Sequence, residues 1–452
     1  NSENRVQSIR AERIESLNSG PASVWWASAG AVDPVETSQE LLSDSSRLDS
    51  PGDRWISVKV PGNLCQEKEF CVTSKDAWYL KSFLLEELPD GHLSFRLGEI
   101  MDRDEVYLNG QLIGKTGTWD SPRPQGYDRH RIYDIPDRAL RRGKNVLLVH
   151  VRGFFPSELG IYRDRTEIGP SSEINGEFLV KNLIECLFLM TYLTSGGYFL
   201  FLFIRRRSER ENIYFALFAL SMVIYQFLRT QFKYLFGLDF YLMKKIEYAV
   251  LFQTITYFYF FVRYLFRLPD TNFTKWFDRF MVLPHLGAAF AILFVLFTDS
   301  VTAWSRVNYF VIQYTVWPTY IVATALILAR RIAKKDRDAL YMSAGIAFLL
   351  IAAVTDILSN RGLFNIPRIM SFAFMMFVSS LALILANRFV RLNEEVEDLN
   401  RNLEKKVQDR TEQLQRSLEE VRALKVQQDG DYFLTSLLIS PLGGNFTDSK
   451  TI

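Results

Sequence analysis

The chain has 452 residues, of which 48% are hydrophobic and 23% charged, and its formal net charge at pH 7 is +2. This balance excludes a disordered chain and a strongly basic nucleic-acid-binding protein, so we expect no nucleic acid partner. Three cysteines exclude a disulfide-rich scaffold and a multi-cysteine zinc protein, and we expect no metal site and no cofactor.

The apolar residues are unevenly spread along the chain. The sequence predicts a multi-domain membrane protein with a β-sandwich or jelly-roll ectodomain at 1–175, a transmembrane domain at 176–390, a coiled-coil helix at 391–428 and the start of an output domain at 429–452. The chain lacks an initiator Met and a signal peptide and stops where a new domain begins, so we interpret it as a processed or truncated fragment.

The first part is predicted to be all-β. Short alternating runs predict strands at 55–60, 78–84, 93–97, 105–108, 111–114 and 146–151. Asn109-Gly110 supplies the two left-handed residues of a tight hairpin turn between the fourth and fifth of these strands. Short strands at this spacing, with no long helix between them, are typical of a β-sandwich or jelly roll.

Four stretches of this domain carry a family resemblance. They are Val60-Pro61-Gly62-Asn63-Leu64, Trp78-Tyr79 with Phe83, Leu97-Gly98-Glu99-Ile100-Met101-Asp102-Arg103-Asp104-Glu105-Val106-Tyr107-Leu108-Asn109-Gly110, and Ile113-Gly114-Lys115-Thr116-Gly117. Over about residues 52–165 the chain is similar to the sugar-binding jelly roll of family 2 glycoside hydrolases, which implies a galactose-binding-like fold. The catalytic carboxylates of those hydrolases lie in a separate barrel domain, so we expect no catalytic residues in this chain.

Aromatic and polar side chains in the β domain are the candidates for ligand binding, since aromatic rings stack on sugar rings and polar groups hydrogen-bond hydroxyls. They are Trp25, Trp26, Trp119, Asp120, Arg123, Tyr127, Arg129 and His130. Six of them belong to a long loop at 118–130. Functional loops have this composition, but so do loops that merely cap a sandwich, and both interpretations stay open.

Two further features of the β domain have a possible structural role. Asp102, Asp104 and Glu105 form an acidic cluster that fits either a calcium site or a solvated strand entry. Cys65 and Cys71 flank a short loop, and an oxidising compartment would allow a disulfide between them. Cys186 lies in the first apolar segment, where we expect it to be inert.

The middle of the chain predicts seven membrane spans. They are 183–204, 212–228, 248–266, 280–298, 307–329, 340–358 and 369–387. Each is about long enough to cross ~30 Å of hydrocarbon as a helix. Seven such segments in succession do not fit a soluble core, so we expect a lipid bilayer around them.

Positive charge in the loops predicts the orientation of the spans. One set of loops carries 13 basic residues: Arg205, Arg206, Arg207, Arg210, Arg263, Arg267, Lys275, Arg279, Arg330, Arg331, Lys334, Lys335 and Arg337. The alternate loops carry 7: Arg229, Lys233, Lys244, Lys245, Arg306, Arg361 and Arg368. The first set is therefore expected in the cytoplasm, with the N-terminal domain extracytoplasmic.

Ionisable and helix-bending residues within the spans are few. Glu185, Glu247, Arg263 and Asp356 all lie near span ends, which argues against ion transport. Pro284, His285 and Pro318 are candidates for a transmembrane hinge, although kinks are ordinary structure and such a histidine is more often satisfied by a neighbouring helix.

The charged segment after Arg388 has apolar residues at heptad spacing. Its predicted seam consists of Leu392, Val396, Leu399, Leu403, Val407, Leu414, Leu418 and Val421, with Thr411 in register and one stutter near Val407. A single helix has nothing to pack this stripe against, so we expect a parallel homodimer through 392–421. Residues 403–414 resemble the linker ahead of histidine kinase and cyclase domains; a mere spacer is the alternative.

The last residues change character. Gly430 is expected to break the helix ahead of a strand-like run, and residues 429–444 resemble the start of a phosphatase 2C-like output domain of the sporulation-phosphatase class. The whole arrangement resembles bacterial seven-transmembrane receptors with diverse intracellular signalling modules. This implies a receptor for an extracytoplasmic ligand, with a carbohydrate as one candidate. A transporter with an accessory binding domain, a membrane-tethered glycan-processing enzyme, and a receptor feeding a kinase or cyclase are the alternatives.

Overall fold

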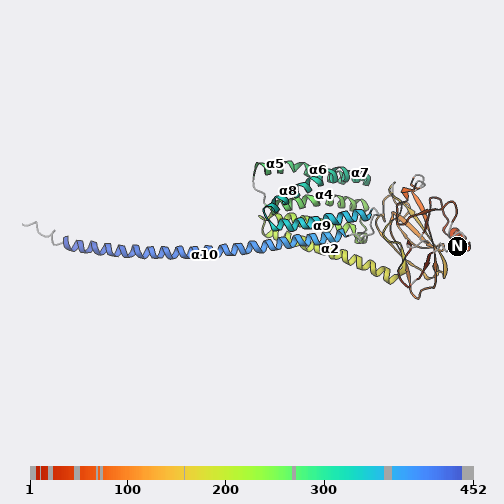
Figure 1. The fold of residues 1–452 in the computed structure, drawn as a ribbon, viewed down its shortest axis with the longest axis horizontal. Helices are drawn as coiled ribbons and strands as arrows, with labels where there is room; N and C mark the ends of the chain where they lie inside the picture. The colour runs from red at the N-terminus through yellow and green to blue at the C-terminus, as the bar shows by residue number, and fades with distance from the viewer. Residues whose placement is uncertain are drawn as a thin grey trace, which may run out of the picture. The chain divides into compact units, whose positions relative to one another are not determined.

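The computed structural model describes residues 7–10, 12–18, 24–44, 51–67, 70–71, 75–156, 158–266, 271–360 and 369–439. The chain forms two compact units, residues 1–378 and 379–452. The first unit contains a β domain followed by a set of helices, and the second contains most of the last helix (Figure 1).

Two sheets make up the β domain. The larger has the strand order β4 (Ile56–Val58), β3 (Trp25–Ser28), β5 (Asp76–Leu85), β10 (Gly143–Arg152), β7 (Arg103–Leu108) and β8 (Gln111–Thr116), with β1 (Gln7–Ile9) pairing to β5. The smaller has the order β11 (Gly160–Arg163), β6 (Leu93–Met101), β12 (Glu167–Pro170) and β2 (Glu15–Ser16), with β9 (His130–Ile135) pairing to β6. One short helix, α1 (Pro34–Ser43), follows β3.

The six strands predicted from the sequence are confirmed as β4, β5, β6, β7, β8 and β10. The predicted hairpin turn joins β7 to β8, and Asn109 and Gly110 have φ of 53° and 86°. The side chain of Asn109 adds to this turn, because its Nδ2 donates to the Ala139 carbonyl at 2.8 Å and its Oδ1 accepts from the Val146 N–H at 2.9 Å. The turn is therefore fixed from both sides of the sheet edge.

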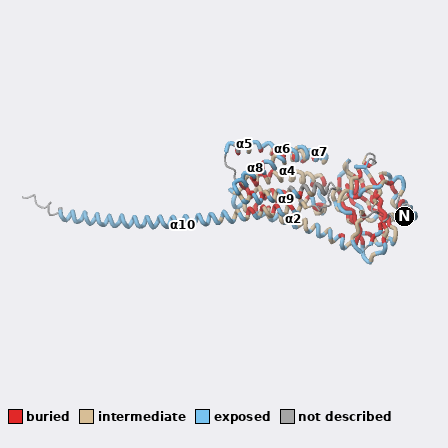
Figure 2. The backbone as a smooth tube through the Cα atoms, viewed as in Figure 1, coloured by how far each residue is buried: buried red, intermediate tan, exposed pale blue. Residues whose placement is uncertain are grey.

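The two sheets share one apolar core, which Figure 2 shows as buried chain within the β domain. Phe83 of β5 and Phe95 of β6 come from opposite sheets and meet edge to face, with ring centroids 6.0 Å apart. Burying a side chain of this size stabilises a fold by about 1.5–3 kcal/mol. The core thus holds the sheets face to face as a sandwich.

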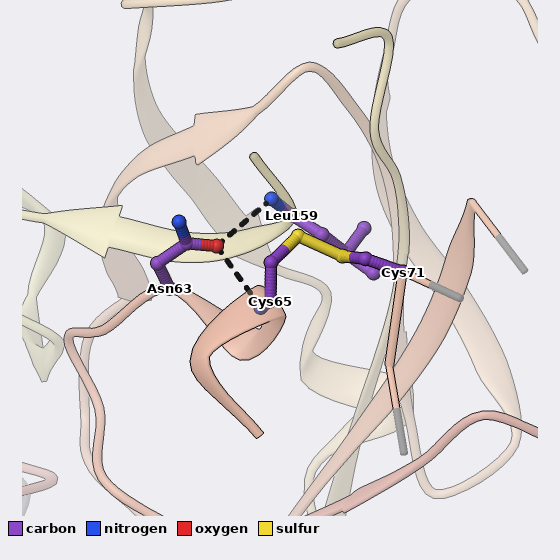
Figure 3. The surroundings of a disulfide bond; sticks show 4 residues. All are labelled: Asn63, Cys65, Cys71 and Leu159. Carbon is purple, nitrogen blue, oxygen red and sulfur yellow. Dashed lines mark hydrogen bonds between the residues drawn. A yellow bond between two sulfur atoms is a disulfide. The ribbon is translucent and has the colours of Figure 1, made fainter. Parts of the chain in front are cut away.

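A disulfide joins Cys65 to Cys71 beside the edge of this core (Figure 3). Cys65 lies in a short 3-10 turn, Leu64–Gln66. The Asn63 Oδ1 accepts from the Cys65 N–H at 3.1 Å and from the Leu159 N–H at 3.2 Å, so the turn is also tied to a distant segment. The only other cysteine, Cys186, is a half-buried free thiol on helix α2.

The last strand of the β domain, β12, runs directly into the first long helix. The helices are α2 (Ser171–Arg205), α3 (Arg210–Arg229), α4 (Phe240–Leu265), α5 (Asn272–Phe280), α6 (Val282–Phe297), α7 (Val301–Val307), a π-helix (Asn308–Val316), α8 (Trp317–Ala333), α9 (Arg337–Asn360) and α10 (Met370–Ile439). Within the described residues, five helical segments are long and apolar enough to cross a membrane: 171–205, 210–229, 274–297, 301–333 and 371–438. The count of seven spans stays a prediction.

Two of the predicted spans are not uniform α-helices. The apolar segment that corresponds to the fourth, residues 274–297, is divided at Met281 into α5 and α6, with Pro284 in the first turn of α6. The fifth contains the π-helix ahead of Pro318, where the proline ring cannot fit against a regular preceding turn. His285 links the two segments, since its Nδ1 lies 2.8 Å from the Tyr320 hydroxyl of α8.

The ionisable residues near the span ends differ in their partners. Glu247 pairs with Lys244, and Arg263 pairs with Asp278 through Nη2 and Oδ2 at 2.8 Å. Glu185 has a buried carboxylate oxygen, Oε2, that finds no hydrogen-bond partner among the described residues. The side chain of Asp356 lies outside the described part of the structure.

The predicted helix break at Gly430 is wrong, because α10 continues to Ile439. Leu434, Leu437 and Leu438 fall at helical spacing, and the first proline after Gly430 is Pro441. One glycine costs a helix only about 1 kcal/mol relative to alanine, which the flanking turns tolerate. The remaining residues of the predicted output domain, 440–452, lie outside the described residues.

Removing the disulfide is expected to destabilise the β domain. The double variant Cys65→Ala/Cys71→Ala should lose about 2 kcal/mol, because the unfolded chain regains the freedom of the closed loop. The measurement is the thermal midpoint of the purified full chain, with Cys186→Ala as the control that should not change it. Dithiothreitol should lower the midpoint of the wild type and leave the double variant unchanged; an equal response of both would contradict this role.

Candidate functional site

The loop at 118–130 connects β8 to β9 and contains most of the predicted ligand-binding residues. Three consecutive side chains at the start of β7 hold it in shape: Asp102, Arg103 and Asp104, each of which is buried. Arg103 donates to three carbonyls of the loop, those of Trp119 (2.6 Å), Ser121 (2.6 Å) and Arg123 (2.9 Å). The first half of the loop is therefore wrapped around one guanidinium group.

Arg131 and the two aspartates fix the second half of the loop. The Asp102 carboxylate accepts from the N–H groups of Gln125 (3.0 Å) and Gly126 (2.8 Å). Arg131 is buried; its Nε donates to Asp104 at 2.7 Å and its other nitrogens donate to the carbonyls of Gly126 and Asp102. Hydrogen bonds to charged groups contribute roughly 1.5–3 kcal/mol each, so this network makes the loop rigid.

The two interpretations of the acidic cluster are both wrong. Asp102 and Asp104 are 1% exposed, so they are not a solvated strand entry. Asp104 is bound by Arg131 and by the Tyr133 hydroxyl of β9, the latter at 2.5 Å, and Asp102 is bound by backbone N–H groups of the loop. Within the described residues, these side chains are not grouped as metal ligands. Glu105 accepts from the Tyr107 hydroxyl at 2.8 Å.

The first aromatic candidates do not form an open binding surface. Trp25 is 1% exposed in the sandwich core, where its Nε1 donates to Asn18 at 2.8 Å, so it cannot stack on a ligand. Trp26 is half-buried against a second apolar cluster on the outer face of the larger sheet. Trp119 is half-buried against His150, with ring centroids 4.5 Å apart, and Asp120 beside it is exposed.

The other four candidates in the loop contact the segment between α3 and α4. Arg123 forms an ion pair with Asp239. The Tyr127 ring packs on Phe240 with centroids 5.5 Å apart, and the Arg129 guanidinium lies 5.8 Å from the centre of the Tyr234 ring. The His130 N–H donates to Gln231 Oε1 at 3.0 Å. These residues therefore form a junction between the β domain and the helices.

Asp128 is the centre of this junction, and sequence reasoning missed it. Its carboxylate accepts from Lys233 Nζ at 2.5 Å and from the Tyr234 hydroxyl, and its carbonyl accepts from Gln231 at 3.0 Å. The Lys233 side chain is 3% exposed. The signal in the sequence was a lysine inside a short aromatic loop, Gln-Phe-Lys-Tyr-Leu-Phe at 231–236, but nothing there indicated which acid would pair with it.

The charge balance at the junction favours the ionised form of Asp128. Burial by itself raises the pKa of this carboxyl, but the positive charges of Lys233 and Lys244 and the hydrogen bonds from Lys233 and Tyr234 outweigh it and hold the pKa below its ordinary value. Lys244 also pairs with Glu247 at 2.8 Å, and Glu247 lies 3.7 Å from Arg229. The junction is thus a network of alternating charges.

A second contact ties the β domain to the first long helix. The His130 Nδ1 lies 3.0 Å from Asp164, and the Nε2 lies 3.8 Å from Glu99 and 3.4 Å from Lys181 of α2. Burial opposes ionisation of Asp164, yet the hydrogen bond from His130 and the charge of Lys181 hold the pKa of Asp164 well below its ordinary value. The imidazole of His130 therefore lies between three charged groups and is not presented to solvent.

Arg96 anchors the first turns of α2. Its Nη1 lies 2.9 Å from both Glu167 of β12 and Glu177 of α2, and its Nη2 donates to the Ile174 carbonyl at 3.0 Å. Because β12 continues into α2 without an intervening loop, this clamp makes the strand and the helix start one rigid piece. Movement within the β domain would therefore be carried to α2.

Residues 181–388 match the family described as 7TM diverse intracellular signalling. Together with the long apolar helices, this match indicates a multi-pass membrane protein and supports the seven-transmembrane receptor type. The curated proteins include no match to this chain.

Part of the chain is similar to solved structures of glycoside hydrolases. A calcium-binding mutant of Bacteroides uniformis β-glucuronidase 2 is 20% identical, covers 34% of this chain and 18% of its own, and has a TM-score of 0.24. A glycosyl hydrolase family 2 member from Bacteroides cellulosilyticus is 18% identical, with coverages of 34% and 20% and a TM-score of 0.26. Ruminococcus gnavus β-glucuronidase is 23% identical, with coverages of 31% and 21% and a TM-score of 0.22. The chain spans about a fifth of the length of these enzymes.

Neutralising Asp128 is expected to weaken the junction. Asp128→Asn keeps the size of the side chain but leaves the buried Lys233 without a counter-charge, which should cost about 3–5 kcal/mol. The measurement is the thermal midpoint of the purified full chain at pH 7, with Asp120→Asn as the matched control on the same loop. Equal midpoints for the two variants would contradict the assigned role.

The same pair predicts a pH dependence. Since the pKa of Asp128 is lower in the folded protein than its ordinary value of about 4, the ionised carboxylate stabilises the fold above that value. The contribution should be lost as the pH falls below about 4 toward the lowered pKa. The difference in midpoint between wild type and Asp128→Asn should therefore be constant from pH 7 to pH 5 and shrink at lower pH. A difference that grows on acidification would exclude this ion pair.

Proposed function

We propose that this chain is the sensing and relay part of a bacterial transmembrane receptor. An extracytoplasmic β domain responds to a ligand, the helices carry the response across the inner membrane, and a dimeric coil passes it to a cytoplasmic output domain. The observation that carries the proposal is the buried contact of Asp128 with Lys233, because it joins a rigid loop of the β domain to the ends of two apolar helices.

The charges at the junction support the proposed orientation. Lys233 and Lys244 belong to the loop set with fewer basic residues, and both lie against Asp128 or Tyr127 of the β domain. The β domain thus contacts the less basic loops, which the positive-inside rule assigns to the outside. The disulfide between Cys65 and Cys71 fits the oxidising conditions of that compartment.

The exposed stripe on α10 supports a homodimer. Leu399, Val407 and Leu414 are 59%, 65% and 63% exposed on the isolated helix, which Figure 2 draws as exposed along this stretch. Apolar side chains repeating at heptad spacing are stabilised when a second helix covers them. The stutter near Val407 gives the coil two packing arrangements of similar energy, which suits a switch.

The proposals for the ligand and for the output domain rest on two family resemblances of the sequence. The similarity of residues 52–165 to a sugar-binding jelly roll favours a carbohydrate ligand for the β domain. The similarity of residues 429–444 to the start of a phosphatase 2C-like domain favours a serine/threonine phosphatase as the output of the full-length protein.

Disulfide crosslinking in membranes tests the dimer. In a Cys186→Ser background, single cysteines at the seam positions Leu403 and Leu414 should crosslink two chains, because they face each other across the coil. Cysteines at Arg401 and Lys405, which lie off the seam on the same helix, are the controls and should crosslink far less. Equal crosslinking at all four positions would contradict the dimeric coil.

The relay is tested with the same cysteines. Adding Asp128→Asn should change the ratio of crosslinking at Leu403 to crosslinking at Leu414, which lie on either side of the stutter, if the junction biases the packing of the coil. Adding Asp120→Asn should leave the ratio as it is. An unchanged ratio in both variants would contradict the relay while leaving the dimer intact.

A further inference from the structure

A cavity of about 2610 Å³ lies in the first unit, between the β domain and the helices. One wall includes Tyr127 and Glu158 of the β domain, and the other is formed by α2, α3, α4, α8 and α9 and the start of α10. Volumes of roughly 300–1,000 Å³ are enough for a small organic ligand. The cavity is therefore large enough to hold one without opening the helices.

Most charged side chains around the cavity are already paired. Arg96 binds Glu177, Lys181 and His130 share Asp164, Lys244 and Arg229 share Glu247, and Asp128 binds Lys233. In all, seven basic and seven acidic side chains line the cavity, so the lining has no excess of positive charge for an anionic ligand.

Two carboxylates of the lining each have one oxygen that lacks a partner. The Oε2 atoms of Glu158 and Glu185 are buried and have no hydrogen-bond partner among the described residues, although Glu158 also accepts a hydrogen bond from the Tyr127 hydroxyl. Glu185 lies on α2, one turn after Lys181, whose amine is directed to Asp164 and His130. A buried carboxylate oxygen without a donor is costly, and buried polar groups are normally satisfied. These two oxygens are therefore available to a donor inside the cavity, and a positively charged donor suits a carboxylate best.

The wall next to Glu185 is aromatic. Phe188 follows Glu185 on α2 and packs on Phe372 with ring centroids 5.0 Å apart. Phe218 and Phe258 both pack on Phe377, at 6.5 Å and 5.6 Å. Aromatic faces attract cations, and they also bury apolar groups.

A third unsatisfied group lies on another helix of the same cavity. The Trp317 Nε1, at the start of α8, is buried and has no acceptor in the part of the chain that the structure describes. A bound molecule that satisfies both Glu185 and Trp317 would need a donor at one end and an acceptor elsewhere. Its middle part would lie against phenylalanine rings.

We propose that this cavity binds an amphiphilic amine. The protonated amino group donates to Glu185, with Glu158 as the second carboxylate, on the β-domain wall. The apolar body lies among the phenylalanines, and a hydroxyl or carbonyl on it accepts from Trp317. A purely apolar occupant such as a lipid chain would leave all three polar groups unsatisfied, which is why the amine is preferred.

Such a ligand would contact the β domain and two of the helices. It would touch the β domain, α2 and α8 at once, so its affinity would depend on how these parts are packed against each other. Only a ligand with different affinities for two arrangements can shift their populations. This consequence rests on the proposed receptor function, whereas binding itself does not.

Binding is tested with three probes that share one apolar body: 4-phenylbutylamine, 4-phenylbutanol and 4-phenylbutyrate. The purified full chain is placed in lipid nanodiscs, and binding is followed by tryptophan fluorescence, with empty nanodiscs as the blank. The amine should bind about tenfold or more tightly than the alcohol, because its ammonium group forms an ion pair with the carboxylate whereas the hydroxyl gives only a neutral donor, and the acid should bind most weakly.

Glu185→Gln is the decisive variant, since it removes the charge but keeps the shape. It should lose about tenfold in affinity for the amine and nothing for the alcohol. Glu173→Gln is the matched control, an exposed glutamate in the first turn of α2 that does not line the cavity. It should bind all three probes as the wild type does.

A second variant keeps the test decisive if Glu185→Gln does not fold. Glu158→Gln should also weaken amine binding selectively, and both variants should keep the wild-type thermal midpoint, because glutamine keeps the size of the side chain and an accepting oxygen. Equal binding of amine and alcohol, or amine binding that is unchanged in both variants, would overturn the proposal. Amine binding with no effect on crosslinking of the coil would uphold the site and count against the receptor relay.

Discussion

The junction depends on one buried charged network at the start of β7. Arg103 donates to carbonyls in the first half of the loop at 118–130, and Arg131 donates to a carbonyl in its second half. Asp102 accepts from backbone N–H groups of the loop, and Asp104 accepts from the Arg131 guanidinium. A loop of this length without such anchors would lose much of its order to conformational entropy. Because these side chains are buried, each bond is made in a low dielectric and is hard to replace by water. The loop can therefore present Asp128 to the helices as a fixed group.

The contact between the β domain and the helices also depends on a buried pair of opposite charges. Lys233 is nearly inaccessible in a short turn between two apolar helices, where an unpaired ammonium group would be costly. Asp128 reduces that cost only while the β domain is docked, so the two parts stabilise each other. The second connection is the direct continuation of β12 into α2, which the ion pairs of Arg96 with Glu167 and Glu177 hold rigid. A domain joined at two places transmits a rotation better than one on a flexible linker, which is the physical basis of the proposed relay.

Features encoded by neighbouring residues were predicted well. The strands follow from alternation, and the hairpin follows from Asn109-Gly110, whose positive φ values are a local requirement. The long apolar helices follow from composition alone. Errors arose where the environment decides the role of a residue. Trp25 is of a residue type that stacks on sugars, but it lies in the core. Asp102 and Asp104, for which a solvated strand entry and a calcium site both stayed open, are buried and bind a backbone N–H of the loop and Arg131. At Gly430 the helical spacing of the leucines that follow outweighs the glycine.

The sequence by itself determined the division into a β domain, apolar helices and a charged helix. The reason is that each part has its own pattern of apolar residues: alternation in the strands, long continuous runs in the apolar helices and heptad spacing in the charged helix. It also indicated that the loop at 118–130 is a candidate for function. Only the tertiary structure decided what that loop contacts, since the pairing of Asp128 with Lys233 joins residues about a hundred positions apart and no local pattern specifies such a pair. The same holds for Glu185, an ordinary residue near a span end in the sequence. It becomes a candidate binding group because the helices around it form a cavity and leave its carboxylate without a partner.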